Sequence, residues 1–167
     1  MSAVTLHLPT LHLLCGKIAA GKSTLAANLA AQAGTVLIGE DAWLARLYPD
    51  EILTVTDYRR CAARLREAMA PHVENLLGCG LSVVLDFPAN TRASRAWMRG
   101  IIARSGTAHL LHFLDVPDEI CRARLHRRNA AGGHDFAAGD AEFDIITSYF
   151  EAPTRDEGFN IRCYTAG

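Results

Sequence analysis

The sequence has 167 residues, of which 50% are hydrophobic and 21% are charged, and its formal net charge is −1 at pH 7. This is the composition of an ordinary globular protein, and the length suits a single domain over residues 1–167 with a sizeable core. The near-neutral charge makes a nucleic-acid partner less favoured, because dedicated nucleic-acid-binding proteins are more often basic. No apolar run approaches the length of a membrane helix and no basic segment opens the chain, so we expect a cytoplasmic protein with no membrane partner.

The cysteines and histidines do not form a metal-binding or disulfide pattern. The chain has 5 cysteines and 7 histidines, and an odd number of cysteines without close pairs argues against a disulfide framework or a zinc site. We therefore expect the cysteines to be small buried residues in a reducing compartment. His109 and His112 lie three residues apart on an expected strand, which puts them on opposite faces.

The chain begins with residues 1–10, which are either a loose leader or an extra edge strand, because a proline separates them from the first apolar run. That run, Leu11–Cys15, is short, as expected for a buried parallel strand. A helical pattern comes next over Ser23–Ala33 and is ended by Gly34. Thr35–Ile38 is predicted as the second strand.

The stretch between the first strand and the first helix has the sequence GKIAAGKS, which matches the phosphate-binding pattern G-x-x-x-x-G-K-S. Glycines let the backbone wrap closely around a polyphosphate, so that amide groups point at its oxygens. Lys22 would put its charge on the β- and γ-phosphates, and the Ser23 hydroxyl would bind Mg²⁺. The alternative is a glycine-containing turn that caps an ordinary helix. The predicted nucleotide-binding residues here are Gly16, Lys17, Ile18, Ala19, Ala20, Gly21, Lys22, Ser23 and Thr24. Thr24 offers a second hydroxyl, but the register of the motif favours Ser23 as the metal ligand.

Two adjacent carboxylates, Glu40 and Asp41, come directly after the second strand. Ligands of open α/β sheets bind at the carboxyl ends of the strands, so this position suggests a site. Asp41 is interpreted as the general base that contacts a substrate hydroxyl, or as the N-cap of a short helix over Ala42–Leu47, and both roles are compatible.

A loop over 50–57 precedes a long helix that begins near Thr56 or Asp57 and runs to about Leu77, because its apolar residues follow the 3.6-residue period. The polar side of this helix is either a solvated face or an anion-binding edge for the acceptor substrate. Its charged residues are Arg59, Arg60, Arg64, Arg66 and Glu67.

The next strand, Leu81–Asp86, is apolar and ends in an acid, as a Walker-B strand does. There the carboxylate holds Mg²⁺ through its water shell, so Ser23 and Asp86 are the predicted metal ligands. The alternative for Asp86 is an acid that begins a turn. Another helix begins at Asn90 or Thr91.

The fourth strand, Ala108–Leu114, is followed by a helix from Pro117 to about Arg128. Arg124, Arg127 and Arg128 share a face of this helix, either as a basic surface stripe or as arginines that close over the transferred phosphate. The segment Ala130–Gly139 is rich in glycine and alanine without periodicity, which is typical of a mobile lid.

The chain then continues as a helix over Asp140–Phe150, a loop over 151–158 and a final strand over Phe159–Tyr164. We find no internal repeat and no second domain in the sequence.

These parts, in this order, resemble the small P-loop kinases of the AAA-domain and zeta-toxin-like ATP-binding family, which is related to chloramphenicol phosphotransferase and polynucleotide kinases. The resemblance runs from about Leu11 to Tyr164. The motifs that carry it are the phosphate-binding loop, Val83–Asp86 followed by Thr91-Arg92 and Trp97, Leu114–Pro117 followed by Arg124 and Arg127-Arg128, and Phe150–Pro153 with Glu157.

The resemblance implies that Asp41 acts on the acceptor hydroxyl and that arginines beside the lid contact the ATP phosphates. It leaves the choice among Arg124, Arg127 and Arg128 open; we take Arg124 and Arg128 as catalytic together with Asp41 and Lys22, and Arg127 as nucleotide-binding. The chain departs from its relatives at Ile18, where they often have a small residue or proline, and this predicts an extra side chain over the loop.

We therefore predict a three-layer α/β fold of the P-loop NTPase type, with a mainly parallel five-stranded sheet in the order 2-3-1-4-5, helices on both faces and a short lid at about 129–140. The predicted function is transfer of the γ-phosphate of ATP, with Mg²⁺, to a hydroxyl of a small molecule. ATP is favoured because no guanine-reading Asn-Lys-x-Asp motif is present. The alternatives are a kinase of a nucleic-acid 5′ end, a non-catalytic nucleotide-binding interaction module and an NTPase motor or switch. The sequence does not identify the acceptor, whose pocket is expected within residues 42–80, or the oligomeric state.

Overall fold

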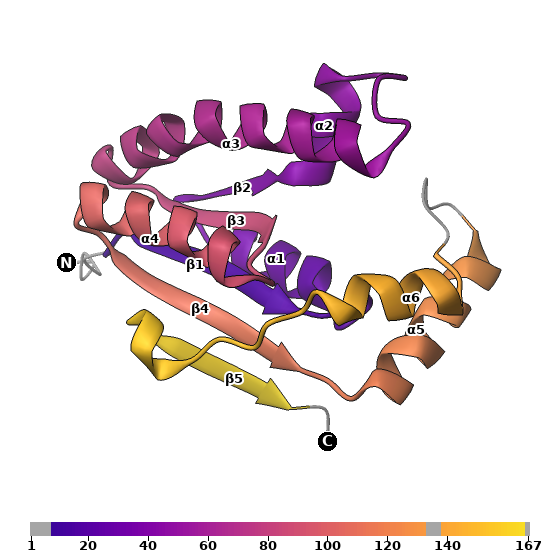
Figure 1. Cartoon of the computed structure of the whole chain (residues 1–167). Helices are drawn as coiled ribbons and strands as arrows, with labels where there is room; N and C mark the ends of the chain where they lie inside the picture. Colours follow the sequence, from indigo (N-terminus) through magenta and orange to yellow (C-terminus); the bar gives the residue numbers. More distant parts are fainter. Residues whose placement is uncertain (1–7, 133–137, 166–167) are drawn as a thin grey trace.

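The first strand, β1 (Thr10–Gly16), lies at the centre of a five-stranded sheet in a computed structural model that describes residues 8–132 and 138–165. The other strands are β2 (Thr35–Gly39), β3 (Ser82–Pro88), β4 (Ala108–Asp115) and β5 (Ile161–Thr165). Their order is β2-β3-β1-β4-β5, and each neighbouring pair is parallel (Figure 1). The predicted fold class and strand order are therefore confirmed.

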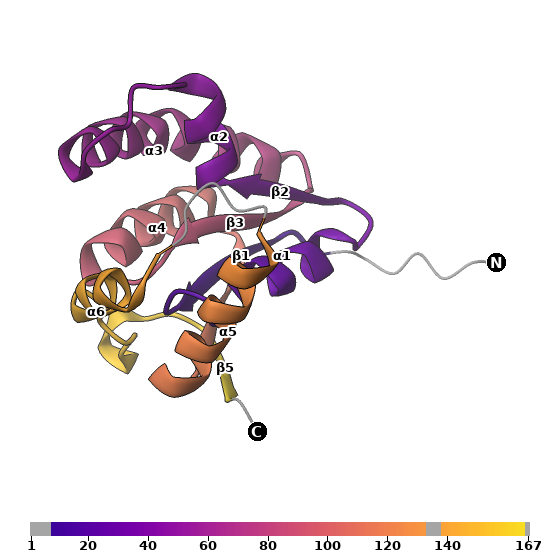
Figure 2. The ribbon, with the colours of Figure 1, turned by 90° about the vertical axis from the view of Figure 1, so that its right-hand side faces the viewer.

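The helices of the described residues follow the strands in turn, and they cover both faces of the sheet. They are α1 (Lys22–Ala30), α2 (Glu40–Leu47), α3 (Val55–Gly78), α4 (Arg92–Ser105), α5 (Asp118–Ala131) and α6 (Asp140–Ser148), with a short 3₁₀ helix, η1 (Arg155–Glu157), before β5. Figure 2 shows α3 and α4 on one side of the sheet and α1 on the other.

The alternation of β1 explains why the sheet is covered on both sides. Leu11, Leu13 and Cys15 are buried in the cluster that contains the α3 and α4 core residues. Leu14 points the other way and packs with Ala26 of α1. Because successive residues of a strand face opposite sides, an almost continuous apolar run is what a doubly covered central strand requires.

Several helix ends differ from the prediction, as α1 and α3 illustrate. The helix α1 stops at Ala30, three residues early, and Gly34, with φ of 73°, lies in the turn that leads to β2. The helix α3 begins at Val55, because Thr54 accepts a hydrogen bond from the Asp57 amide and the Asp57 carboxylate accepts one from the Thr54 amide. This capping box outweighs the apolar periodicity that suggested a later start.

The lid prediction falls partly on residues 133–137, and the leader prediction falls mostly on residues 1–7, which lie outside the described residues. On the near side of the lid, α5 continues to Ala131 and so includes the first residues of the segment predicted to be irregular.

The cysteines are free, as predicted, but their burial differs from one to another. Cys15, Cys61 and Cys121 are buried, whereas Cys79 and Cys163 are exposed, so the expectation of burial is wrong for these two. Burial raises the pKa of Cys15 to about 11, so its thiol stays protonated at neutral pH.

Two further absences hold for the described part of the chain. No group of histidine, cysteine, aspartate or glutamate residues there is arranged to hold a metal by itself. No described helix combines the length and the apolar character that a membrane crossing needs.

Candidate active site

The segment between β1 and α1 forms a tight loop, as the G-x-x-x-x-G-K-S pattern predicts. Ala19 and Gly21 take positive φ angles of 60° and 107°, and the Ala20 amide donates to the Lys17 carbonyl at 3.1 Å. A Cβ atom at Gly16 would lie 3.1 Å from the Leu114 Cβ, so a side chain does not fit there. The loop leads directly into α1, where Ser23 and Thr24 are exposed in the first turn.

Lys22 turns its ammonium group back into this loop. The Nζ atom donates to the carbonyl oxygens of Gly16 at 2.6 Å and of Lys17 at 2.8 Å. Burial lowers the pKa of Lys22, while Asp86 foremost, and Asp41 more weakly, act in the opposite direction. The charge of Lys22 is therefore held at the loop in the field of these two carboxylates.

Asp86 lies where β3 leaves its regular register with β1. Leu13 pairs with Leu85 but Leu14 pairs with Pro88, so Asp86 and its neighbour form an irregularity in the strand. Bulges of this kind redirect side chains and are frequent beside active sites. Because β3 continues to Pro88, the alternative of a turn-initiating aspartate is wrong. Burial raises the pKa of Asp86, Lys22 lowers it, and Asp41 raises it further.

Asp41 occupies the first turn of α2 and is exposed. The helix begins earlier than predicted, at Glu40, and its N-cap is Gly39. The N-cap interpretation of Asp41 is therefore wrong, because Asp41 is already the second helical residue. Gly39 of β2 pairs in register with Asp86 of β3, so Asp41, two residues after Gly39, follows a neighbouring strand end. The loop that leads to Lys22 follows β1, the next strand in the sheet, so all three residues come from the carboxyl edge of the sheet. Asp41 accordingly acts electrostatically on both Lys22 and Asp86.

Glu40, next to Asp41, has a supporting role at the site that the sequence did not predict. Its side chain is 1% exposed and accepts hydrogen bonds from the Tyr58 hydroxyl and from Arg66, whose Nη2 lies 3.1 Å away. Arg66 also lies over the Trp97 ring of α4, 5.8 Å from its centroid. These contacts fasten the first turn of α2 to α3 and α4, so that Asp41 is carried by an anchored helix start.

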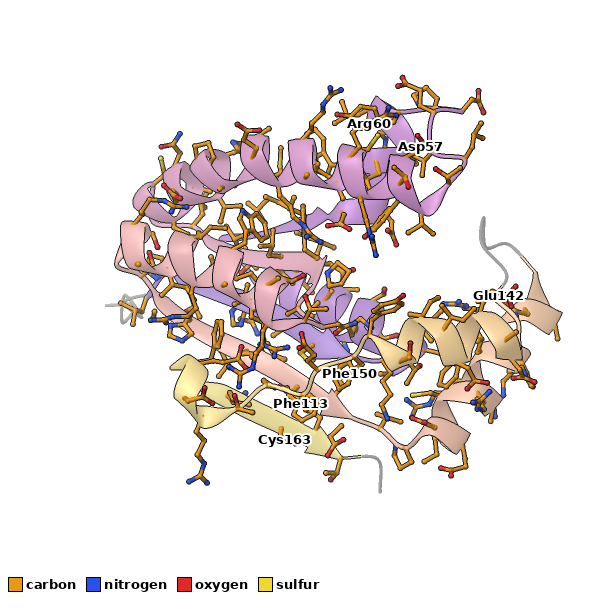
Figure 3. The ribbon with its side chains drawn as sticks, in the orientation of Figure 1. Asp57, Arg60, Phe113, Glu142, Phe150 and Cys163 are labelled. Carbon is orange, nitrogen blue, oxygen red and sulfur yellow. The ribbon has the colours of Figure 1, made fainter. Side chains whose placement is uncertain are left out.

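The arginines of α3 differ in their surroundings. Arg66 belongs to the buried Glu40 contact, so the solvated-face interpretation is wrong for it. Arg60 forms an ion pair with Asp57 at the start of α3 (Figure 3). Arg59 and Arg64 are exposed.

The loop is held from the other side by α5. Lys17 forms an ion pair of 2.5 Å with Asp118, and Arg124 donates to the Ala20 carbonyl at 3.1 Å. Ile18 packs against the apolar cluster of α5 that contains Leu125. The same cluster contains Ala20 of the loop, so Ile18 has an apolar environment beside the loop. That its side chain stands over the loop stays a prediction.

The three predicted phosphate-contacting arginines differ in their surroundings. Arg124 touches the loop backbone through the Ala20 carbonyl, and Arg127 is exposed on the same helix. Arg128 is half-buried, and its Nε atom is buried without a hydrogen-bond partner among the described residues.

A second residue that the sequence did not reveal as functional is Asn90. Its Oδ1 atom accepts from the Gly16 amide at 2.9 Å, and its own carbonyl accepts from the Glu151 amide at 2.9 Å. Asn90 thereby joins the loop to the segment after α6. Its position four residues after Asp86, which ends the predicted Walker-B-like strand, was the only signal, and that position alone specifies no contact.

The segment after α6 is fixed by a fully buried arginine. Arg95 of α4 is 0% exposed and forms a two-point ion pair with Glu157, with Nε–Oε2 at 2.7 Å and Nη2–Oε1 at 3.0 Å. Its Nη1 atom donates to the carbonyls of Ala89 at 2.9 Å and Glu151 at 2.7 Å. The predicted family motif at Glu157 is thus a structural contact that closes the chain over β3 and α4.

Comparison with known proteins agrees with this fold. The AAA domain family matches residues 11–153. No curated protein is similar enough in sequence to count as a relative.

Several solved structures share the fold at low sequence identity. A Chloroflexus aurantiacus protein assigned as a kinase is 18% identical with a TM-score of 0.74, over 96% of this chain and 86% of that one. The Kti12 protein of Chaetomium thermophilum, solved with ADP-AlF3, is 17% identical with a TM-score of 0.70, over 93% and 88%. The APS kinase CysC of Mycobacterium tuberculosis, solved with AMPPNP and APS, is 19% identical with a TM-score of 0.62, over 95% and 88%. The phosphate-binding loop and the order of the strands agree with the similar structures, so the chain has the fold of the small P-loop kinases. Because the family model matches most of its length, this chain belongs to the AAA domain family.

Proposed function

We propose that this protein is an ATP-dependent phosphotransferase that moves the γ-phosphate to a hydroxyl of a small molecule. The observation that carries the proposal is the convergence of Lys22, Asp86 and Asp41 at the carboxyl edge of the sheet. Such a transfer requires a cation for the phosphates, an acid for the metal and an acid for the acceptor. Lys22, the half-buried Asp86 and the exposed Asp41 would supply these in turn.

The nucleotide would bind along the loop from Gly16 to Thr24, whose backbone amides face a polyphosphate in this type of turn. Lys22 would exchange its carbonyl partners for β- and γ-phosphate oxygens. Arg124 and Arg128 would neutralise charge on the transferred phosphate, and Arg127 would contact the nucleotide from the same helix. The nucleotide analogues bound by two of the similar structures support this assignment.

The donor set near the loop fits a magnesium ion that arrives with the nucleotide. Mg²⁺ prefers oxygen ligands, keeps several waters and needs only one or two protein groups beside the substrate phosphates. The exposed Ser23 hydroxyl and the Asp86 carboxylate would hold it. When bound, the ion would neutralise phosphate charge and keep the phosphate chain extended.

In the transfer itself the acceptor oxygen forms a bond to the γ-phosphorus, while the bond from that phosphorus to the β,γ-bridging oxygen breaks. The hydroxyl proton passes to the Asp41 carboxylate, and ADP leaves. Asp41 suits this role because it is exposed to an incoming substrate, whereas Glu40 is buried and fully occupied.

The test is the variant Asp41→Asn. We expect its affinity for ATP to stay within about twofold and its phosphoryl transfer to fall by about 10²–10⁴-fold, because a positioned general base contributes that much. The control is Asp156→Asn, since Asp156 lies on η1 and its ion pair with Arg92 of α4 is exposed. ADP release is measured with a panel of hydroxyl-bearing metabolites, antibiotics and nucleic-acid 5′ ends.

Other results would identify one of the competing functions. Near-normal transfer by Asp41→Asn would remove Asp41 from the mechanism. Turnover only with nucleic-acid ends would identify an end kinase, and ATP binding without turnover across the panel would favour a nucleotide-binding module.

A further inference from the structure

A cleft lies between the start of α3 and α6, and none of its lining residues belongs to the proposed phosphate-binding or catalytic set. Its volume is about 270 Å³, and it is lined by Val55, Glu142, Ile145 and Ile146. Val55 and Ile145 are 68% and 61% exposed. Figure 3 shows Glu142 on the side of α6 that faces the α2–α3 region, across from the helix start that carries Asp57.

One wall of this cleft belongs to the nucleotide-binding part of the molecule. The α6 helix is tied to α5 by ion pairs from Arg122 to Asp140 and Asp144, and Arg122 lies 4.4 Å from the centroid of the Phe143 ring. The α5 helix in turn holds the phosphate loop through its contacts with Lys17 and Ala20. Ile145 and Ile146 are therefore positioned relative to the loop by a continuous series of contacts.

The other wall belongs to the part that carries the proposed base. Val55 begins α3, and Tyr58, one turn further on, donates to Glu40 at the start of α2. Asp41 follows Glu40 directly. The cleft thus lies between the unit that would hold ATP and the unit that would activate the acceptor, which is where the acceptor of a direct phosphoryl transfer has to bind.

The chemistry of the walls indicates what the acceptor is. Val55, Ile145 and Ile146 are branched apolar side chains, and covering their exposed surface with the apolar part of a ligand would remove it from water, which favours binding. A polyol would instead lose hydrogen bonds to water on entering an apolar cleft. Sites of this size bind most of a small ligand with apolar walls and orient it with a few polar groups.

We propose, on the basis of the function proposed above, that the acceptor is an alcohol with an apolar body, held between Val55 of α3 and Ile145 and Ile146 of α6, with its hydroxyl toward Asp41. Sugars and nucleic-acid ends lack the apolar surface that these walls would cover.

The first experiment measures binding without turnover. Isoleucine δ1-methyl NMR spectra are recorded while 2-phenylethanol, 1-hexanol or glycerol is titrated into the full-length protein. We expect the Ile145 and Ile146 signals to shift and saturate with the two apolar alcohols and to stay in place with glycerol. The variant Ile145→Asn should weaken that binding about tenfold, the scale of one lost apolar contact in a pocket. The control Leu8→Asn removes an equally exposed apolar residue before β1, at the opposite edge of the sheet, and should leave the binding unchanged.

The second experiment measures transfer from Mg-ATP to the same alcohols, to glucose and to an oligonucleotide 5′ end. An apolar alcohol should have the highest kcat/KM, and Ile145→Asn should raise its KM about tenfold with little change in kcat. Binding that depends on Ile145 without transfer to any of these acceptors would keep the apolar binding site, and would overturn both the proposed function and the role of the bound alcohol as acceptor. Transfer to glucose or to a 5′ end that is insensitive to Ile145→Asn would keep the function and overturn the inference, and so would equal binding of glycerol.

Discussion

Lys22 shows at the level of one residue how this site is prepared for an anion. Its ammonium group donates hydrogen bonds to two loop carbonyls and lies in the field of Asp86, and these interactions offset the cost of burying its charge. A polyphosphate offers stronger, charge-assisted hydrogen bonds than carbonyl groups do. Exchange of partners is therefore favourable when the nucleotide arrives.

We predict that Lys22→Ala weakens ATP binding by more than tenfold, because it removes a charge-assisted contact worth about 1.5–3 kcal/mol. The measurement is a titration with a fluorescent ATP analogue. Arg104→Ala is the control, since Arg104 forms an exposed ion pair with Glu74 far along α4. Lys17 and Lys22 are the only lysines of the sequence, so ATP should also protect the chain from lysine acetylation. Equal affinity in both variants would contradict the assigned role of the loop.

His112 is a second residue whose surroundings decide its behaviour. It is 0% exposed and lies between His12, whose Nδ1 is 3.0 Å from its Nε2, and Tyr164, whose hydroxyl is 2.7 Å from its Nδ1. Burial foremost, followed by His12 and Arg162, lowers the pKa of His112 to about 4. His109, on the opposite face of the same strand, accepts from the Asn160 amide instead.

We predict a stability that falls in acid through His112. Because its folded pKa lies below the ordinary value of 6.5, the unfolded chain binds the proton more readily between about pH 6.5 and 4. The free energy of unfolding should therefore decrease as the pH falls through that window, by about 3 kcal/mol in total at 1.36 kcal/mol per pKa unit. Urea unfolding at several pH values measures it. His112→Gln should flatten this pH dependence and the exposed His72→Gln should not; an unchanged slope in His112→Gln would contradict the prediction.

At the scale of elements, the phosphate loop is held by contacts from several sides. Asn90 after β3 binds the Gly16 amide, and α5 supplies Asp118 and Arg124. Arg95 of α4 binds the Ala89 carbonyl, next to Asn90, and ties it to Glu157. The segment from Phe150 to Glu157 is part of this support, and Phe150 stacks on Phe113 of β4 (Figure 3).

We predict that Arg95→Ala destabilises the protein by about 3–5 kcal/mol, because it leaves Glu157 and several carbonyls buried without a partner. Arg92→Ala is a matched control, since Arg92 binds the same segment through an exposed pair with Asp156, and it should destabilise the protein far less than Arg95→Ala. Urea unfolding compares the two. If Arg95→Ala does not fold, Glu157→Gln provides the milder test, and equal costs for the buried and exposed pairs would refute the argument.

At the scale of the whole molecule, the sheet brings to one edge groups that are far apart in the sequence. The loop follows β1, Asp41 follows β2 and Asp86 belongs to β3, and the parallel order β2-β3-β1 puts all three strand ends side by side. The helices α3 and α6 extend over that edge from opposite sides (Figure 1). The cleft of the proposed acceptor site lies between these two helices, so it forms only when the whole chain is folded.

The sequence by itself determined the phosphate loop, the five strands and their parallel arrangement. The loop is predictable because its glycines, lysine and serine act on a phosphate chain through their own local spacing. The strands are predictable because short apolar runs alternate with helical patterns along the chain. Helix ends were less predictable, since Thr54 with Asp57 and Gly39 before Glu40 compete with periodicity through local capping.

Only the tertiary structure decided which polar residues are buried and which remain available. Nothing local distinguishes Glu40 from Asp41, or Arg95 from Arg92, yet one of each pair is buried and paired while the other lies nearer the surface. Their partners Arg66 and Glu157 are distant in the chain, and the cleft between Val55 and Ile145 has walls from two helices with no common motif. Burial and long-range pairing are properties of the packed chain, so a single sequence read residue by residue does not contain them.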